Sequence, residues 1–266
     1  SRGPDEVVEE IRGLVDRGVH ELVLIAQDLG SYGKDIGSAD LSGLLRRVTA
    51  LPGDFWVRLL YIHPEHFPDE LLDIAASDGR ILPYFDLPFQ HASPRILRAM
   101  GRRGDTARNL ALVERIRSRL PGAAIRSTFL VGVPGETDDD FTALCDFQDA
   151  ARLDWVGAFA YSREEDTPAY GMTPRVAAGI AADRKAAVEE RQIPITAAAL
   201  DARIGATVDV LVEERIEGEE MSLGRAFFQA PDVDGLVVVR GKAEPGAVVR
   251  VRLEKRNGVD MEGARA

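Results

Sequence analysis

Cysteine is nearly absent from this sequence, since Cys145 is the only one in 266 residues. A single thiol excludes a disulfide within the chain, and it also excludes an iron–sulfur cluster ligated by cysteines of this chain alone. Cys145 lies near Phe141 and Leu144 in an apolar segment, so we expect a buried structural thiol.

Long apolar runs are also absent. No stretch approaches the roughly 18 consecutive apolar residues that a membrane-spanning helix needs. The first residues contain no cationic segment followed by an apolar one, and Pro4-Asp5-Glu6 instead opens an amphipathic helix. These features predict a cytoplasmic protein with no membrane partner.

Positive charge is scarce, because 33 Lys and Arg face 44 Asp and Glu, a formal net charge of -11. Such a chain is repelled by a nucleic-acid backbone over any wide contact, and it attracts basic proteins. We therefore expect a basic protein partner rather than nucleic acid, although acidity also serves solubility.

Two common ligand-binding patterns are missing. His63 and His66 stand three residues apart, but Pro64 disfavours a regular helix there and no third ligand is evident. The segment from Gly132 to Gly135 is not followed by the Lys-Ser or Lys-Thr of a phosphate-binding loop. The sequence therefore predicts no metal site and no phosphate loop of this type.

What the sequence does contain is an alternation of apolar strands and helices. The predicted strands are residues 21–26, 56–61, 81–87, 124–131 and 155–160. Strands separated by helices favour a parallel sheet with right-handed crossovers, hence an α/β barrel or an open doubly wound sheet. Arg58 lies inside one of these strands, where it must either point into the barrel mouth or form a buried ion pair.

The pattern changes near residue 204. A long helix is predicted from about Arg175 to Leu200, with Pro194 as a point where it would break. Strands are then predicted at 207–212, 221–228, 235–240 and 247–256, with glycines at the turns. We therefore expect two domains, 1–203 and 204–266, the second a small antiparallel barrel or sandwich. Residues 205–266 carry 12 acidic and 9 basic side chains, which favours a protein over tRNA as its partner.

The loops after the predicted strands hold the candidate site residues, because ligands of parallel α/β folds lie beyond the C-terminal ends of the strands. Gln27 and Asp28 follow the first strand, where they would bind a ligand or form a polar turn. His91, between Gln90 and Ser93, is a ligand-binding or a structural histidine. Glu164 and Glu165 are better explained as a solvated loop than as a catalytic pair.

The stretch from Arg126 to Glu136 joins a buried strand to a turn. Gly132, Pro134 and Gly135 allow a turn whose backbone amides approach a ligand, and Thr137 to Asp140 form a capping box for the next helix. The positive end of that helix lies beside the turn, which suits a small polar or anionic ligand.

Four segments carry a family resemblance: Ala26–Gly33, Leu87–Leu97, Phe129–Thr137 and Tyr161–Pro168. Together they resemble the radical S-adenosylmethionine (SAM) methylthiotransferases, and Ala230–Val238 resembles the TRAM domain of that family. The tRNA-modifying relatives usually read Gly-Gln-Asn in place of Ala26-Gln27-Asp28 and Gln-Ser-Gly-Ser in place of Gln90-His91-Ala92-Ser93. The chain is thus more similar to the branch that modifies an aspartate of a ribosomal protein.

The resemblance implies an incomplete parallel (β/α) barrel of the radical SAM type, followed by a small antiparallel TRAM-like β-barrel. The family's CxxxCxxC motif and first barrel strand, and a domain with a second cluster, are expected before Ser1. We therefore expect a fragment that is inactive alone. The alternatives are a fragment of a tRNA methylthiotransferase, a non-catalytic module that binds a ribosomal protein, and a natural paralogue that has lost its cluster.

The implied parent enzyme uses SAM and two 4Fe-4S clusters to methylthiolate the β-carbon of an aspartate in small-subunit ribosomal protein twelve. That carbon has no acidic proton, so a radical is needed and the protein supplies binding and orientation. By resemblance, Gly132, Pro134, Gly135 and Glu136 line the adenosine, and Gln90, His91 and Ser93 the ribose or methionine. Gln27 and Asp28 would lie near the methionine amino group or the substrate, and Tyr161 near the adenine; no catalytic residue is identified.

Overall fold

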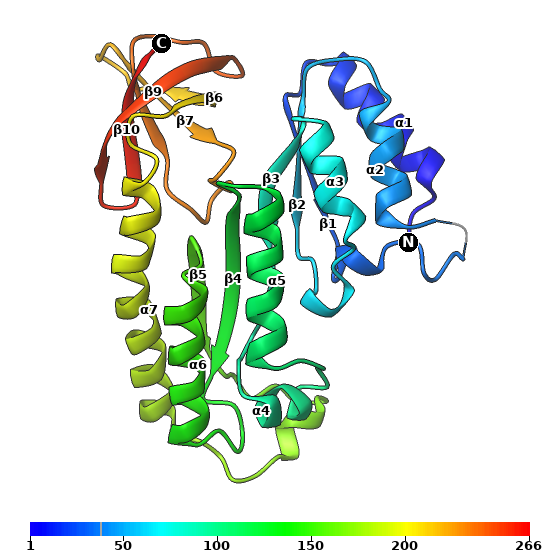
Figure 1. The fold of residues 1–266 in the computed structure, drawn as a ribbon, viewed down its shortest axis with the longest axis vertical. Coiled ribbons are helices and arrows are strands. Elements are labelled where there is room, and N and C mark those ends of the chain that lie inside the picture. The colour runs from blue at the N-terminus through cyan, green and yellow to red at the C-terminus, as the bar shows by residue number, and fades with distance from the viewer. Residues whose placement is uncertain (38) are drawn as a thin grey trace.

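The computed structural model describes residues 1–37 and 39–266, and its N-terminal part is built on a five-stranded parallel sheet (Figure 1). The strands lie side by side in chain order, each parallel to the next. Their bounds are β1 (Glu21–Ile25), β2 (Trp56–Leu60), β3 (Ile81–Asp86), β4 (Ala124–Val131) and β5 (Trp155–Ala160). The predicted α/β architecture is confirmed.

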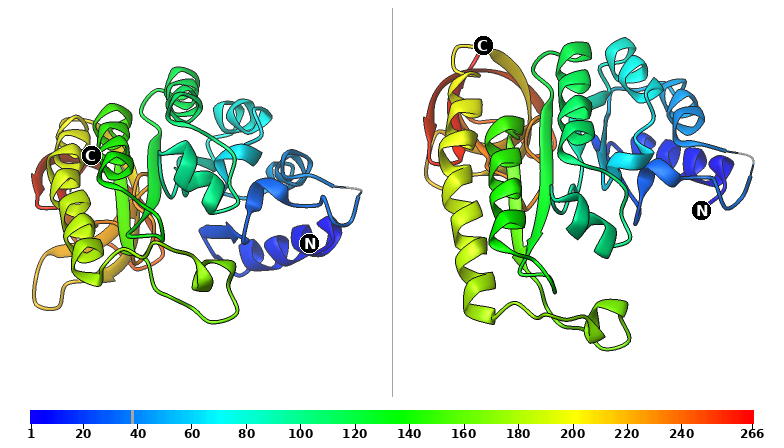
Figure 2. Two further views of the ribbon diagram at one scale, coloured as in Figure 1. Left: turned by 90° about the horizontal axis from the view of Figure 1, so that it is seen from below. Right: turned by 60° about the horizontal axis from the view of Figure 1, so that its bottom comes forward.

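Helices cover the outer face of this curved sheet, as the two views of Figure 2 show. They are α1 (Pro4–Asp16), α2 (Leu41–Thr49), α3 (Glu70–Ser77), α4 (Pro94–Ala99), α5 (Thr106–Arg119), α6 (Asp138–Ala151) and α7 (Ala178–Asp201), with short 3-10 turns η1 (Leu29–Ser31), η2 (Pro64–His66) and η3 (Pro168–Gly171). Buried aliphatic and aromatic side chains such as Leu45, Val57 and Phe147 fill the space between helices and sheet. The predicted capping box forms at α6, where the Thr137 and Asp140 side chains each accept from the other's backbone amide.

The helix α7 runs through Pro194 without interruption, so the predicted break there is wrong. Buried hydrogen bonds fix α7 to the start of β5: Gln192 Nε2 donates to the Leu153 carbonyl at 2.8 Å, and Thr196 Oγ1 donates to the Asp154 carbonyl at 2.7 Å. These contacts on either side of Pro194 outweigh the one backbone bond that a proline removes from a helix.

The C-terminal part is a closed barrel with the strand order β10-β8-β7-β6-β9. Its strands are β6 (Thr207–Arg215), β7 (Met221–Ala226), β8 (Val237–Arg240), β9 (Val248–Asn257) and β10 (Asp260–Arg265). The fifth strand, β10, was missed by the sequence prediction because it contains Gly263 and has no β-branched residue. It pairs antiparallel with β9 but parallel with β8, so the barrel is antiparallel except at this closing pair.

The strand β1 forms one edge of the parallel sheet, and its side chains Val23 and Ile25 are 38% and 65% exposed. An exposed edge strand of this kind is open to pairing with a further strand. None of the helices in residues 1–37 and 39–266 is long and apolar enough to cross a membrane.

The barrel sits against the N-terminal ends of the parallel strands, at the top of Figure 1. Residues 227–236, which join β7 to β8, form what we call the seat segment. Arg58 Nη1 donates to the Phe227 carbonyl at 2.8 Å, and Trp155 Nε1 donates to the Phe228 carbonyl at 2.7 Å. Arg58 also forms a fully buried ion pair with Glu21 at 2.6 Å, which decides between the two alternatives for this residue.

Candidate functional site

The loops after the five parallel strands lie along the C-terminal edge of the sheet, at the bottom of Figure 1. Backbone hydrogen bonds join neighbouring loops: the Leu29 amide donates to the Tyr61 carbonyl at 2.9 Å, and the Tyr161 amide donates to the Val131 carbonyl at 2.8 Å. The fold thus brings the predicted site residues of separate loops to one edge.

Asp28 ties the loop after β1 to the loop after β2. Its Oδ1 accepts from the amides of Gly30 and His63, each at 3.1 Å. Its Oδ2 accepts from the Ser31 hydroxyl at 2.5 Å and contacts Nδ1 of His66. Burial raises the pKa of the Asp28 carboxyl, but the hydrogen bonds from Ser31, His66 and the His63 amide outweigh it and the pKa is lowered. The carboxylate is therefore engaged within the protein.

His91 belongs to the loop after β3, and it is completely buried. Its Nδ1 accepts from the amides of Ala92 and Ser93, both at 3.0 Å, which places the proton of the neutral ring on Nε2. Burial lowers the pKa of His91 to about 4. Nε2 lies 4.0 Å from Oε2 of Glu136 and has no hydrogen-bond partner among the described residues. His91 supports this edge from inside the protein.

Ser93 connects α4 to α6. Its hydroxyl donates to Oδ1 of Asp140 at 2.6 Å, while Oδ2 of Asp140 accepts from the Thr137 amide at 2.9 Å and pairs with Arg95. Burial raises the pKa of Asp140, but hydrogen bonds from Ser93, Thr137 and Arg95 outweigh it and the pKa is well below its usual range. The Ser93 hydroxyl is therefore also engaged.

Glu136 organises the turn after β4. Its Oε2 accepts from the Val133 amide at 3.1 Å, and its Oε1 accepts from Arg184 Nη1 at 2.9 Å. Burial raises the pKa of the Glu136 carboxyl despite Arg184 and the Val133 and Gly132 amides, which act in the other direction. The Gly135 amide donates to the Pro174 carbonyl at 2.7 Å. The predicted turn forms, but its amides are paired within the protein.

Gly132 has a structural reason to lack a side chain. Its φ is +74°, and a Cβ there would lie 2.3 Å from Cβ of Ala181 in α7. The close approach is thus to a helix of the protein, and Pro134 and Gly135, which are half-buried, form the more accessible part of the turn.

Three of the predicted side chains have no protein partner among the described residues. Gln27 is exposed, and Gln90, half-buried with φ +66°, lies where its backbone bridges to β4. The hydroxyl of Tyr161 is buried and makes no hydrogen bond. A buried hydroxyl without a partner is costly, so Tyr161 is a candidate contact for a ligand.

Sequence reasoning missed Tyr61 and Asp86 at this edge, and Arg126 between Asp86 and the opposite end of the sheet. Tyr61 has φ +65°, its amide donates to Asp86 Oδ2 at 3.1 Å, and Asp86 lies beside Arg126. A signal existed for Asp86 and Arg126, because charged residues within apolar strands need partners. Nothing in the sequence marks Tyr61, since its left-handed conformation is one that a tyrosine rarely adopts.

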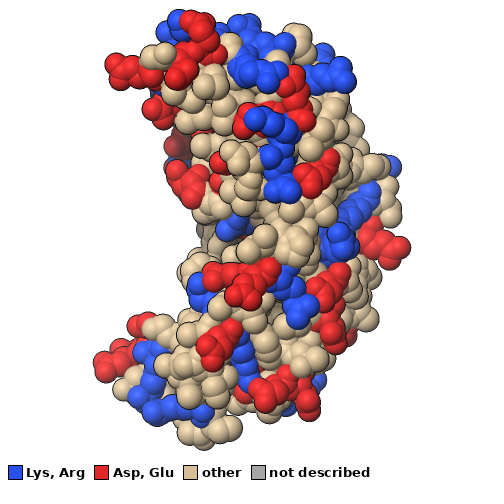
Figure 3. All heavy atoms as spheres, turned by 90° about the vertical axis from the view of Figure 1, so that its left-hand side faces the viewer, with Lys and Arg blue, Asp and Glu red and all other residues tan. Residues whose placement is uncertain are grey.

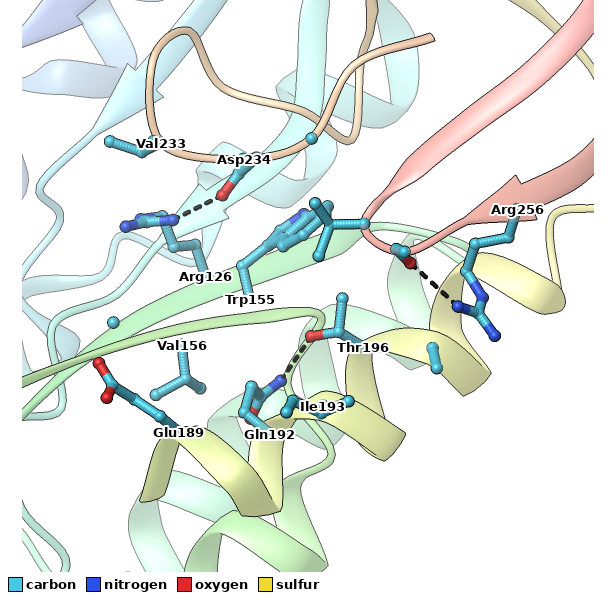
Figure 4. Close-up of a pocket in the computed structure, with 15 residues that line it drawn as sticks. Arg126, Trp155, Val156, Glu189, Gln192, Ile193, Thr196, Val233, Asp234 and Arg256 are labelled. Atoms are coloured by element: carbon cyan, nitrogen blue, oxygen red, sulfur yellow. Dashed lines mark hydrogen bonds and ion pairs between the residues drawn. The ribbon is translucent and has the colours of Figure 1, made fainter. Parts of the chain in front are cut away.

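A cavity of about 410 Å³ lies at the opposite end of the sheet, among β5, α7 and the barrel (Figure 4). Ile193 and Val233 stand at its mouth, 68% and 54% exposed, and Arg126 pairs with Asp234 in its wall. None of the predicted site residues lines this cavity. It is therefore separate from the C-terminal edge.

Cys145 is buried on α6, as predicted. In residues 1–37 and 39–266 no group of three or more His, Cys, Asp or Glu side chains is arranged to hold a metal ion. The side chains of this chain therefore do not fit an iron–sulfur cluster, which takes several thiolates.

The fold and the strand-end loops agree with a comparison against protein families. A model described as the radical SAM superfamily matches residues 1–147, more than half of the chain. The chain belongs to the radical SAM superfamily. A second model, described as a TRAM domain, matches residues 204–265, which include the closed barrel of this radical SAM protein.

Curated relatives of this radical SAM protein are similar over nearly its whole length. The ribosomal protein uS12 methylthiotransferase RimO of Treponema denticola is 41% identical over 98% of this chain and 63% of its own length. The proteins of the same name from Moorella thermoacetica and Thermosipho africanus are 44% and 39% identical, over 95% and 99% of this chain and 58% and 61% of their own lengths. The chain spans about three fifths of the length of these relatives.

Among solved structures, coproporphyrinogen III oxidase (HemN) from Escherichia coli matches this radical SAM protein with a TM-score of 0.50. The match covers 95% of this chain and 60% of that chain at 13% identity. At this identity the likeness supports the fold alone.

Proposed function

We propose that this chain is the SAM-binding and substrate-positioning part of a RimO-type enzyme that methylthiolates the β-carbon of an aspartate in ribosomal protein uS12. The observation that carries the proposal is the extent of the similarity. It reaches 35–44% identity over 95–99% of the chain and so includes the barrel as well as the residues of the radical SAM model. Shared radical SAM ancestry alone would not extend into the barrel.

The domain division that fits this proposal is 1–203 for the incomplete radical SAM barrel and 204–266 for the TRAM-like barrel. The parallel sheet and α7 fall within the first part, and β6 to β10 within the second. The short connection after Asp201 is the only covalent link between these two units among the described residues. The seat segment, Arg225 and Arg256 supply contacts between them.

Two groups of residues would act differently on SAM. We assign direct contact to Gln27, Gln90 and Tyr161, whose polar side-chain groups have no protein partner among the residues described. Tyr161 and the accessible part of the turn, Pro134 and Gly135, would face the adenosine. In this proposal the Tyr161 hydroxyl donates to or accepts from the nucleoside, which satisfies a group that is otherwise buried and unpaired.

The second group would hold the loops in place. The polar side chains of Asp28, Ser93 and Glu136 are engaged by protein donors and acceptors, and His91 is fully buried. Their role would be to fix the loops before the ligand arrives, which lowers the entropic cost of binding. Gly132 belongs with them, because its contact is with α7.

SAM supplies the radical precursor of the family's chemistry when it is bound with a reduced cluster. The residues present fit SAM, since a buried hydroxyl and two free amide side chains lie along the edge. They do not fit an iron–sulfur cluster. In this proposal the parent enzyme has two clusters, and the thiolates that hold them come from residues other than these 266. What the chain itself does is bind and orient.

The substrate side of the proposal is a basic ribosomal protein in the cytoplasm. The chain carries a net charge of -11. Figure 3, which shows the face formed by α7 and the barrel, displays Lys and Arg interspersed with Asp and Glu rather than a broad basic surface. Nucleic-acid backbones bind through wide basic surfaces, so this face favours a protein over tRNA.

SAM binding tests the cofactor part of the proposal. Isothermal titration of the purified chain with SAM should show saturable binding, and Tyr161→Phe should weaken it about three- to tenfold, the range for one hydrogen bond. Tyr170→Phe is the matched control, because that ring packs against Arg163 on the exposed loop after β5. Equal affinity of the two variants would remove Tyr161 from the site.

Partner capture tests the substrate part. Immobilised chain should retain purified uS12 and release it as salt rises, because opposite charges drive the contact. A tRNA pool at the same concentration should not be retained. Retention of tRNA but not of uS12 would assign the chain to the tRNA-modifying branch, and retention of neither would overturn the partner assignment.

A further inference from the structure

Tyr61 adopts a backbone conformation that is expensive for its residue type. Its φ is +65°, in the left-handed region, and its side chain is 40% exposed at the C-terminal end of β2. A bulky residue in this region costs of order 1–3 kcal/mol and persists only where surrounding contacts enforce it. The contacts that enforce it are therefore informative.

Both polar groups of the Tyr61 backbone are held. The amide donates to Oδ2 of Asp86 at 3.1 Å, and the carbonyl accepts from the Leu29 amide at 2.9 Å. The next amide, that of Ile62, donates to the Asp86 carbonyl at 2.9 Å. Asp86 thus fixes the Tyr61 turn, and through Leu29 the turn fixes the loop that carries Gln27.

Asp86 is a buried carboxylate, only 6% exposed, and it needs a cation. Nε of Arg126 lies 4.0 Å from its Oδ1. The same guanidinium donates through Nη1 to Oδ1 of Asp234 at 2.5 Å. Arg126 therefore lies between one carboxylate of the sheet and one carboxylate of the seat segment.

Asp234 is fixed in turn by two other contacts. Its Oδ2 accepts from the hydroxyl of Tyr84 at 2.7 Å and from the Ala230 amide at 2.9 Å, and its side chain is completely buried. The contacts run from the seat segment, through Arg126 and Asp86, to Tyr61, and the 4.0 Å approach of Arg126 to Asp86 is their longest step. They join the two ends of the parallel sheet through its interior.

We infer that Asp86 is a positioning residue that holds Tyr61 and the loop after β1, and that the TRAM-like barrel sets the position of Asp86 through Asp234 and Arg126. Loss of the Asp234 charge frees Arg126 to move onto Asp86, where it competes with the Tyr61 amide for the same carboxylate. A change at the seat segment is then felt at the C-terminal edge. This coupling is independent of which ligand the edge binds.

Hydrogen exchange of the Tyr61 amide tests the inference without any ligand. In Asp234→Asn, which keeps the side-chain shape, Tyr61 and Leu29 amides should exchange roughly tenfold faster, because the local hydrogen bonds weaken. Amides in β9 and α5 should keep their protection, which separates this effect from global unfolding. Asp234→Glu, which keeps the charge, should restore protection at Tyr61.

Asp201→Asn is the matched control. Asp201 also joins the two units, pairing with Arg256 of β9 at 2.8 Å, but it is exposed and makes no contact with Arg126 or Asp86. Its removal should leave Tyr61 exchange unchanged. Equal effects of the two substitutions would show that any loosening between the units reaches Tyr61, and would overturn the inference.

A double-mutant comparison gives a second criterion. Asp86→Asn alone should accelerate Tyr61 exchange, and adding Asp234→Asn should accelerate it no further, because both act through one carboxylate. Additive effects would contradict the inference. If Asp234→Asn does not fold, Arg126→Lys provides the same comparison, since lysine cannot span both carboxylates with a planar fork. Unchanged Tyr61 exchange in folded Arg126→Lys would equally overturn it.

Discussion

Buried polar groups lie at both ends of the parallel sheet, but the distance along the sequence to their partners differs greatly between the two ends. At the N-terminal end, Glu21 pairs with Arg225 across 204 positions, and Arg126 pairs with Asp234 across 108. At the C-terminal end, His91 accepts from an amide two residues away and Glu136 from one three residues away. The first end is closed by another unit of the fold, whereas the second is organised by its own loops.

This difference separates stability from binding. Long-range ion pairs that are buried on both sides leave no group for a ligand, and they fix the barrel against the sheet. At the C-terminal end, contacts within and between the loops, such as those of His91 and Asp28, order the edge, while the side chains of Gln27, Gln90 and Tyr161 make no hydrogen bond among the described residues. These side chains are therefore the candidates for ligand contact at an edge that the other contacts hold in place.

We expect the largest effect from a substitution at the N-terminal end of the parallel sheet. Arg58→Ala should lower the free energy of unfolding by about 3–5 kcal/mol, because the guanidinium is fully buried and its loss leaves the buried Glu21 with one partner fewer. Urea denaturation measures this. Arg46→Ala, which removes an exposed pair with Glu70, should cost below about 1 kcal/mol. Equal losses would contradict a difference in burial.

The next effect concerns the C-terminal end. His91→Ala should lower the free energy of unfolding by about 2–3 kcal/mol, because the buried amides of Ala92 and Ser93 lose their acceptor. His20→Ala is the control, as His20 is half-buried and makes no side-chain hydrogen bond in the described part of the chain. An unchanged free energy of unfolding in both variants would mean that the loop after β3 keeps its structure without the imidazole.

His91 should also contribute to the pH dependence of stability. Its pKa in the folded protein is lowered to about 4, below the ordinary value of 6.5. Between these values the unfolded chain binds a proton that the folded chain does not, so stability should fall as pH falls from about 6.5 to 4. The slope is at most about 1.4 kcal/mol per pH unit from this group. His91→Ala should remove that slope in thermal melts, and an unchanged slope would assign it to other groups.

The smallest effect lies at the surface between the two units. Asp201→Asn removes an exposed ion pair with Arg256, and we expect a loss below about 1 kcal/mol that shrinks further with salt. Denaturation at low and high ionic strength measures it. A loss as large as that of Arg58→Ala would mean that the rim, and not the buried seat segment, fixes the barrel.

The same contrast explains what the sequence could reveal. Parts of the C-terminal edge are built from local patterns, so the strand ends, the turn from Gly132 to Gly135 and the capping box at Thr137 could be predicted. The engagement of Asp28 could not, because two of its donors, the His63 amide and His66, belong to the loop after β2. The contacts of Arg58 and Arg126 with the barrel depend on packing between distant segments.

Two misses have particular physical causes. The strand β10 carries little intrinsic strand preference and is formed by pairing with β8 and β9 on either side. A break in the helix was predicted at Pro194, but buried contacts of Gln192 and Thr196 hold α7 together across it. In both, tertiary contacts outweigh a local preference.

The position of β10 between β8 and β9 also bears on how the protein is made. Of the ten strands described, β10 is the one that leaves the ribosome last, and the barrel cannot close before it emerges. The parallel sheet is complete much earlier in synthesis. During translation the N-terminal end of the sheet, with Arg58 and Arg126, therefore stays exposed to solvent until the barrel closes. A chaperone that recognises unpaired strands has its longest opportunity to bind in that interval.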